Sequence, residues 1–337
     1  MSGAKKNKKE NIGGGLKKLS TLHSQLPTKD NNSQFSIEVN GLTKLYEKGK
    51  TVAVDNISLS VNKGELFGLI GPDGAGKTSI FRMLTTLLLP DKGTATVDGF
   101  DIRKDYKQIR STVGYMPGKF SLYQDLTVEE NLKFFATIFN TTIKENYHLI
   151  KDIYIQIEPF KNRRAGKLSG GMKQKLALCC ALIHKPTTLF LDEPTTGVDP
   201  VSRKEFWEML KRLKEQNITI LVSTPYMDEA KLCDRVALIQ TGKILSINTP
   251  ADIVKSYPGD LYAIKAAEMH ALLKGLRKYD MTLESYAFGE YAHASFKNNF
   301  FDENEIQTYL ESEGLHDVEI RSAEVTIEDS FIKLLKN

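Results

Sequence analysis

The sequence predicts an α/β domain built on a parallel sheet, followed by a small α+β domain. Short apolar strands alternate with helices up to about residue 246, a pattern typical of a parallel sheet covered by helices. A glycine-rich turn at residues 71–78 joins a buried strand to a helix, and residues 247–337 contain a different succession of strands and helices. With 337 residues, 41% of them hydrophobic, the chain can form a substantial core.

Residues 1–34 are expected to form a disordered basic tail. They carry many polar residues, a glycine run at 13–15, and lysines at positions 5, 6, 8, 9, 17 and 18. Such a composition cannot bury enough apolar surface to fold. A solvated tail is the simpler interpretation, and a weak attraction to anionic lipid or RNA stays open. No apolar stretch follows the lysines, so a signal peptide is not predicted.

The overall composition argues against several classes of function. The net charge of +4 does not indicate a strongly basic surface for specific nucleic-acid binding. No apolar run reaches the roughly 18–20 residues that span a bilayer, so a membrane-spanning part is expected on another chain. The cysteines at 179, 180 and 233 form no CxxC pair, and we expect them to be buried and reduced.

The α/β domain is expected to begin near Phe35, at residues 35–246. Alternating residues predict strands at Phe35–Val39 and Thr51–Val61. An apolar run predicts a buried strand at Glu65–Ile70, which leads through the glycine-rich turn to a helix from Lys77.

The second half of this domain begins with a mainly helical region, at residues 121–182. In it, Asp125–Thr127 opens a helix through Val128–Phe139. A strand, a helix and a second strand are then expected at Thr187–Leu191, Ser202–Lys214 and Ile218–Ser223.

The C-terminal domain, residues 247–337, has the pattern of a ferredoxin-like βαββαβ unit with an added helix. It contains no motif that implies separate chemistry. Its expected elements, in order, are Leu261–Ala266, Met269–Tyr279, Leu283–Phe288, His293–Phe296, Glu303–Glu313, Val318–Arg321 and a last helix from Ile327.

The segment Gly71–Thr78 matches the phosphate-binding P-loop pattern and lies between a strand and a helix. Glycines allow backbone N–H groups to close around phosphates, and the helix N-terminus adds about half a unit of positive charge. We expect Lys77 to hold the β- and γ-phosphates of ATP, and Thr78 to coordinate Mg²⁺. The expected nucleotide-binding residues here are Gly71, Asp73, Gly74, Ala75, Gly76, Lys77, Thr78 and Ser79.

Two carboxylates, Asp192 and Glu193, follow the apolar strand Thr187–Leu191. Alone, an acidic pair after a strand is most simply a solvated loop. Beside a P-loop, we expect Asp192 to bind Mg²⁺ through water and Glu193 to polarise the attacking water as general base.

The segment Leu168–Gln174 reads Leu-Ser-Gly-Gly-Met-Lys-Gln. A helix N-terminus that presents a serine and paired glycines can bind a γ-phosphate through backbone N–H groups. With the P-loop before it and the acidic strand after it, this chain resembles the ABC ATPase family over roughly Phe35–Ser246. The resemblance implies a P-loop NTPase fold with a helical subdomain at about 119–183. It also implies that Ser169, Gly170, Gly171 and Gln174 contact ATP bound to a second subunit.

Other positions extend the resemblance. Tyr46 matches the aromatic residue that stacks on adenine, with a core tyrosine as the alternative. Val198–Pro200 matches the loop through which two subunits sense each other. Residues 114–117 and 120–131 are similar to the segment of exporter ATPases that lies under the permease's coupling helix, and Thr326–Ile332 resembles the ending of drug-exporter ATPases.

Three positions depart from the family pattern. Gly118 stands where a glutamine would contact Mg²⁺ and water, and Pro225 stands where a histidine would contact the γ-phosphate. Asp73 replaces the usual asparagine and adds negative charge near the phosphates. Nucleotide binding is expected to survive these changes. Hydrolysis at the chain's own site is expected to be weak, because loss of one positioning group costs about 10²–10³ in rate.

The resemblance therefore implies an ATP-binding and ATP-hydrolysing subunit of an exporter, working with a separate ABC-2-type permease. It would lie peripherally at the cytoplasmic face of the cell membrane. The departures favour a heterodimer with a second ATPase over a homodimer. Two alternatives stay open: a soluble ABC ATPase that acts on ribosomes or another cytosolic assembly, and a largely non-hydrolysing regulatory subunit.

Overall fold

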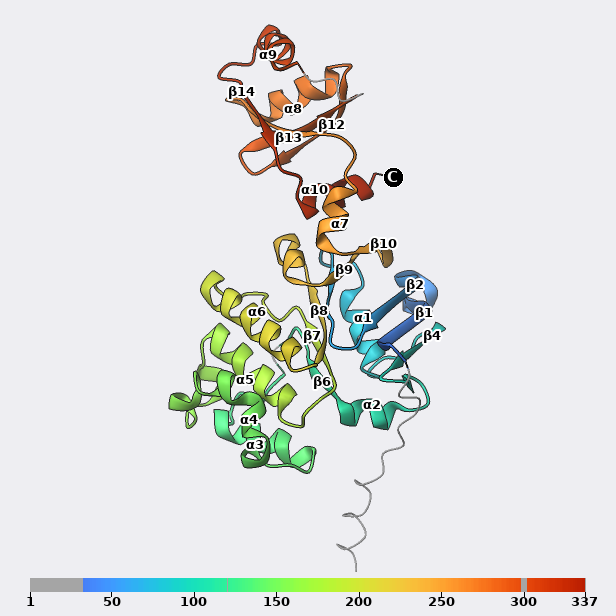
Figure 1. Cartoon of the computed structure of the whole chain (residues 1–337), viewed down its shortest axis with the longest axis vertical. Helices are drawn as coiled ribbons and strands as arrows, with labels where there is room; N and C mark the ends of the chain where they lie inside the picture. The colour runs from blue at the N-terminus through green and yellow to red at the C-terminus, as the bar shows by residue number, and fades with distance from the viewer. Residues whose placement is uncertain (1–32, 120, 298–301, 337) are drawn as a thin grey trace, which may run out of the picture.

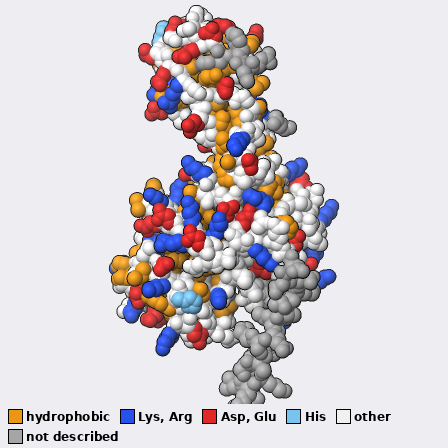
Figure 2. Space-filling view, in the orientation of Figure 1, with side chains coloured by type: hydrophobic (Ala, Val, Ile, Leu, Met, Phe, Trp, Pro, Cys, Tyr) orange, Lys and Arg blue, Asp and Glu red, His pale blue; other side chains and the backbone are white. Residues whose placement is uncertain are grey.

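The structure is a computed structural model that describes residues 33–119, 121–297 and 302–336. Figure 1 shows a large part below and a smaller part above, the latter formed by the C-terminal residues. The predicted basic tail lies outside the described residues, apart from Ser33 and Gln34. On the face seen in Figure 2, positive and negative side chains are interspersed rather than gathered by sign.

The large part contains an antiparallel sheet that the sequence did not predict, with strand order β2-β1-β4-β5. The alternating pattern predicted the first part of β1 and nearly all of β2. It did not predict β4, β5 or the continuation of β1 beyond Val39, where a register shift interrupts the pairing with β2. The strands of this sheet are β1 (Phe35–Tyr46), β2 (Thr51–Asn62), β4 (Lys92–Val97) and β5 (Phe100–Asp101), and a short 3-10 helix η1 (Glu47–Gly49) joins the first two.

A second sheet, with order β10-β9-β3-β8-β7-β6, forms the centre of the large part. The pairs β3–β8, β3–β9, β7–β8 and β6–β7 are parallel, as predicted, whereas β9 and β10 pair in antiparallel fashion. Its strands are β3 (Leu66–Ile70), β6 (Val113–Met116), β7 (Thr188–Asp192), β8 (Thr219–Thr224), β9 (Arg235–Gln240) and β10 (Lys243–Asn248).

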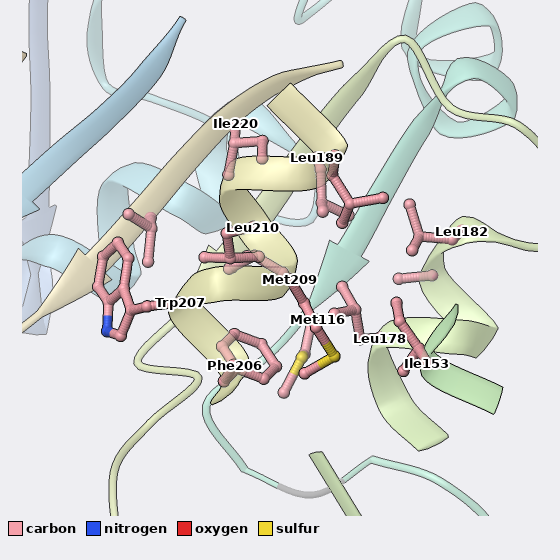
Figure 3. Close-up of a cluster of buried hydrophobic side chains, with 14 of the residues drawn as sticks. Met116, Ile153, Leu178, Leu182, Leu189, Phe206, Trp207, Met209, Leu210 and Ile220 are labelled. Carbon is pink, nitrogen blue, oxygen red and sulfur yellow. The ribbon is translucent and has the colours of Figure 1, made fainter. Parts of the chain in front are cut away.

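Helices cover both faces of this sheet, because alternate strand residues enter two different cores. In β7, Leu189 and Leu191 belong to one core and Phe190 to the other. The first core packs under α3 (Val128–Ile138), α4 (Ile143–Tyr154), α5 (Gly170–Leu182) and α6 (Pro200–Glu215), and Figure 3 shows its interdigitated side chains. The second core holds α1 (Lys77–Leu84) against the antiparallel sheet, with α2 (Tyr106–Thr112) at its edge.

The start of α3 agrees with the expected helix opening. Thr127 accepts a hydrogen bond from the backbone of Glu130, and the Glu130 side chain accepts one from the backbone of Thr127. This capping box satisfies two N–H groups that have no partner within the helix. Short 3-10 helices complete the region at η2 (Glu158–Phe160), η3 (Ala165–Lys167) and η4 (Met227–Leu232).

All three cysteines are buried and free, as predicted. Burial raises the pKa of each thiol, so none is a reactive thiolate at neutral pH. No helix in the described ranges combines the length and apolarity needed to span a bilayer.

The small part contains an antiparallel sheet of order β12-β13-β11-β14. Two helices pack with it around a core of its own, and the order is that of the predicted βαββαβ unit. Its elements are β11 (Leu261–Lys265), α8 (Met269–Lys278), β12 (Thr282–Phe288), β13 (Tyr291–Phe296), α9 (Glu303–Ser312) and β14 (Glu319–Ala323). Helices α7 (Pro250–Lys255) and α10 (Ile327–Leu334) join it to the large part.

A buried carboxylate fastens α10 to the sheet of the small part. Asp329 Oδ1 accepts hydrogen bonds from Tyr286 Oη at 2.8 Å and His293 Nδ1 at 2.7 Å. Its other oxygen accepts from the backbone N and hydroxyl of Thr326, which caps α10. Burial by itself would raise the pKa of Asp329, but these hydrogen bonds outweigh it and lower the pKa below its ordinary value.

Replacing Asp329 with asparagine is expected to lower the free energy of unfolding by about 1.5–3 kcal/mol at pH 7, because charge-assisted hydrogen bonds are lost. The depressed pKa means that the carboxylate stabilises the fold above the unfolded-state pKa of about 3.9 and loses this effect as pH falls through the folded-state pKa. Urea unfolding followed by circular dichroism should show a difference that is constant down to about pH 5 and narrows below pH 4. The exposed Asp280→Asn is the control, and a pH-independent difference would contradict the assignment.

Candidate nucleotide-binding site

The P-loop lies between the end of β3 and the start of α1, as expected, and its glycines have separate structural reasons. A Cβ at Gly71 would lie 2.1 Å from the carbonyl oxygen of Ile239. A Cβ at Gly76, whose φ is +104°, would lie 2.3 Å from the carbonyl oxygen of Ala53. Gly74 has a φ of +78° and open space around it. The first two glycines therefore let neighbouring strands approach, while the third lies on the open side where phosphates would bind.

Lys77 lies beneath this loop with its charged end buried. Its Nζ donates hydrogen bonds to the carbonyl oxygens of Gly71 at 2.8 Å and Pro72 at 3.0 Å. It also forms an ion pair with Glu193 Oε1 at 3.1 Å. The lysine is thus held in place by the loop that would carry phosphates, and an incoming phosphate competes with Glu193 for its charge.

Asp192 is buried at the end of β7, beside the start of α1. Its carboxylate accepts hydrogen bonds from Ser223 Oγ at 2.7 Å and from the side chain of Thr78. Burial, reinforced by the neighbouring Glu193 charge, raises the pKa of Asp192. A hydroxyl and a buried carboxylate that lacks a full counter-charge are hard oxygen donors suited to Mg²⁺. The two predicted metal ligands therefore lie together and fit the ion.

Glu193 adopts a left-handed backbone conformation, with φ of 51°. This conformation is costly for a non-glycine residue, by about 1–2 kcal/mol. Its N–H donates to the carbonyl oxygen and to Oγ of Ser223, at 3.1 and 3.0 Å. Ser223, which the sequence analysis did not single out, thus holds both acidic residues. Its position at the end of a buried strand next to β7 is the signal that could have identified it.

Gly118 and Pro225, two of the positions that depart from the family pattern, lie close to this site. A Cβ at Gly118 would lie 3.0 Å from the carbonyl oxygen of Asp192 and 3.8 Å from Glu193 Cβ. Pro225 directly follows β8, whose last residue, Thr224, accepts a hydrogen bond from Gly71 N at 3.2 Å. Side chains at 118 and 225 would therefore border the acidic pair and the P-loop. Asp73 is exposed on the loop.

Tyr46 ends β1 beside the first turn of α1. Its hydroxyl is 3.2 Å from Ser79 Oγ, and Lys44 Nζ lies 5.8 Å from the ring centre. The ring is only partly buried. Ala75 is buried, and its carbonyl oxygen accepts a hydrogen bond from Gly242 N. Tyr46, Ala75 and Ser79, all predicted to bind nucleotide, therefore lie together at the N-terminal end of α1.

The segment Leu168–Gln174 lies apart from the P-loop, at the start of α5. Ser169 caps α5, accepting a hydrogen bond from Met172 N at 3.4 Å, and Ser169 and Gly170 are exposed. A Cβ at Gly171 would lie 2.6 Å from Ser202 Oγ, so this glycine lets α5 approach α6. Gln174 lies in the next turn of α5, near Val198.

Helices α1 and α5, which carry the two phosphate-binding motifs, belong to the cores on opposite faces of the central sheet. The predicted nucleotide-binding residues therefore form two groups within one chain: one around the P-loop and one at the start of α5.

Comparisons with known proteins agree with this arrangement. A family model described as ABC transporter matches residues 54–196. The chain is 38% identical over 302 residues to the probable multidrug ABC transporter ATP-binding protein YbhF of Escherichia coli, covering 89% of this chain and 52% of that protein. The chain thus spans about half the length of that relative.

Two further proteins are similar over most of their own length. The Nod factor export ATP-binding protein I of Mesorhizobium japonicum is 33% identical over 309 residues, which cover 90% of this chain and 88% of that protein. Among solved structures, cbiO1 from Clostridium perfringens, part of the ABC transporter complex cbiONQ, matches with a TM-score of 0.59 and 25% identity. That match covers 66% of this chain and 92% of the other.

Proposed function

Because the chain belongs to the ABC transporter family of ATP-binding proteins, we propose that it binds and hydrolyses ATP as the nucleotide-binding subunit of an exporter. The observation that carries this proposal is the meeting of Lys77, Asp192 and Glu193 under one P-loop. The printed names of two relatives, a probable multidrug transporter protein and a Nod factor export protein, support an export role. They give no support to the alternative of a ribosome-acting protein.

Each residue of the site has a distinct task in hydrolysis. The open P-loop backbone and the α1 N-terminus bind the phosphates, and the Lys77 ammonium neutralises the terminal ones. When a phosphate takes over the charge of Lys77, the Glu193 carboxylate is released from its ion pair and can orient water for attack. Mg²⁺, held by Thr78 and Asp192 together with phosphate oxygens, would offset the negative charge that develops.

A complete site requires two subunits. The exposed Ser169 and Gly170 at the start of α5 lie on the other face of the sheet from α1. They are free to meet the phosphates of ATP bound to a paired subunit in head-to-tail fashion. With glycine at 118 and proline at 225, this chain's own site lacks two polar groups. The paired subunit is therefore a second ATPase that keeps glutamine and histidine there.

The partner in the membrane is a separate permease that docks beside Gly118. A cavity of about 190 Å³ lies there between the end of β6 and helices α3 and α5. Apolar and aromatic side chains dominate its wall, including Leu87, Tyr115, Leu122, Phe135 and Phe139. Apolar side chains at the end of an amphipathic permease helix would pack into this cavity. The chain then lies peripherally at the cytoplasmic face of the membrane.

Introducing a charge at the rim of this cavity is expected to release the chain from membranes. Leu87 is 50% exposed, so Leu87→Glu places a carboxylate in the docking groove without disturbing the core. The membrane-bound fraction should fall about tenfold or more, since a buried unpaired charge costs several kcal/mol, while ATP affinity stays unchanged. Leu283→Glu, at a site 48% exposed on the small domain, is the matched control. Equal membrane recovery of the two variants would contradict the docking site.

The function itself is tested by isolating the chain from its native membranes and measuring ATP hydrolysis of what co-purifies. A permease and a second ATPase are expected in the complex. A purely ribosomal association, or a complex that binds ATP without turnover, would contradict the proposal.

A further inference from the structure

A buried carboxylate that the proposed function does not use lies close to the site. Glu229, in η4, is 1% exposed. It accepts hydrogen bonds from Thr195 Oγ1, at 2.9 and 3.2 Å to its two oxygens, and from Thr224 Oγ1. Arg203 Nε lies 3.7 Å from the same carboxylate. A buried charge is tolerated only where hydrogen bonds and a counter-charge satisfy it, as they do here.

The partners of Glu229 come from three segments: the loop after Glu193, the end of β8 and helix α6. Thr195 lies two residues after Glu193, on the way to Val198–Pro200. Thr224 ends β8 directly before Pro225, and its Oγ1 also accepts a hydrogen bond from Tyr226 N at 3.1 Å. Arg203 lies in α6, which Asp199 caps.

Arg203 adds a second contact to this junction. Its guanidinium lies 4.2 Å from the ring centre of Tyr226, a distance typical of cation–π attraction. The segment after β8 is thereby fixed on both sides of Pro225: through Thr224 to Glu229, and through Tyr226 to Arg203. The Glu229 carboxylate thus connects the loop after Glu193 with the segment around Pro225, the position at which the family pattern has a histidine.

We propose that Glu229 is a positioning residue for ATP hydrolysis. It ties Thr195 to Thr224 and so fixes the place of Glu193 and of the Val198–Pro200 loop relative to the P-loop. At position 225 a proline has no side-chain donor to be drawn in by the γ-phosphate, so internal hydrogen bonds fix the segment instead. This inference rests on the proposed ATPase function and adds the residue that holds its geometry.

The test is steady-state ATP hydrolysis by the intact complex carrying Glu229→Gln. The amide keeps the size of the side chain but loses the charge and one acceptor oxygen, which weakens its hydrogen bonds with Thr195 and Thr224. We expect kcat to fall about tenfold, since small misplacements of catalytic groups cost up to about 10²-fold. The KM for ATP should stay within about twofold, because Lys77 and the P-loop are untouched.

Variants of Thr195 separate positioning from folding. Thr195→Val removes the donor and keeps the shape of the side chain, so it should lower kcat as Glu229→Gln does. Thr195→Ser keeps the hydroxyl, so its kcat should stay near that of the unaltered complex. Glu208→Gln, on the exposed side of α6, is the matched control and should leave both constants unchanged.

The outcomes distinguish this inference from the proposed function. A wild-type complex that does not hydrolyse ATP would contradict both. A wild-type complex that hydrolyses ATP, with kcat unchanged in Glu229→Gln and Thr195→Val, would contradict only the role of Glu229. The role of Glu229 would also be contradicted if kcat of Glu229→Gln fell only in proportion to the fraction of protein that still binds ATP, while Thr195→Val stayed fully active.

Discussion

Replacement of Lys77 by alanine is expected to weaken ATP binding by about 10- to 150-fold, which corresponds to the roughly 1.5–3 kcal/mol of a charge-assisted hydrogen bond. The ammonium is already held under the loop by the carbonyl oxygens of Gly71 and Pro72. Little ordering of the side chain is therefore needed when phosphate binds. Without it, Glu193 also loses its ion-pair partner and adds an unbalanced negative charge near the phosphates.

Isothermal calorimetry of the purified chain measures this effect directly. Lys243→Ala is the control, because Lys243 forms only an exposed ion pair with Asp55, and such pairs contribute about 0–1 kcal/mol. Equal ATP affinity of Lys77→Ala and the unaltered chain would exclude the P-loop as the nucleotide site.

The second large effect is expected from Ser169→Arg. Ser169 is exposed at the N-terminus of α5, where a bulky side chain would stand between this helix and the phosphates on the paired subunit. Removing one transition-state contact of this kind costs about 10²–10³ in rate. Steady-state hydrolysis by the assembled complex should fall by that factor. ATP binding at Lys77 should be unchanged, because α1 and α5 belong to cores on opposite faces of the sheet.

The glutamate substitutions test whether the pair is asymmetric. In the proposed heterodimer we expect the slower site to be the one on this chain, since Gly118 and Pro225 leave Glu193 without two neighbouring polar groups. Glu193→Gln should therefore reduce hydrolysis only modestly, whereas the matching change in the paired ATPase should nearly abolish it. Equal losses from the two changes, or full activity of this chain as a homodimer, would overturn the heterodimer.

The sequence by itself determined the local features of this protein. The strand before Gly71, the helix from Lys77 and the capped helix at Ser169 depend on residue types at short, fixed spacings, and the structure has them within a residue or two of the expected limits. The same holds for the buried strand that ends in Asp192. Short-range geometry of this kind is set by backbone dihedrals and local hydrogen bonds, which neighbouring residues specify.

The contacts between distant segments were decided only by the tertiary structure. The antiparallel sheet, the ion pair of Lys77 with Glu193 and the hydrogen bonds of Ser223 to both acidic residues join parts of the chain far apart in sequence. The same applies to Glu229 with Thr195 and to Asp329 with His293. Sequence marks such residues only as polar. Their roles arise because folding removes them from water, and a buried charge is stable only where the fold brings donors or a counter-charge to it.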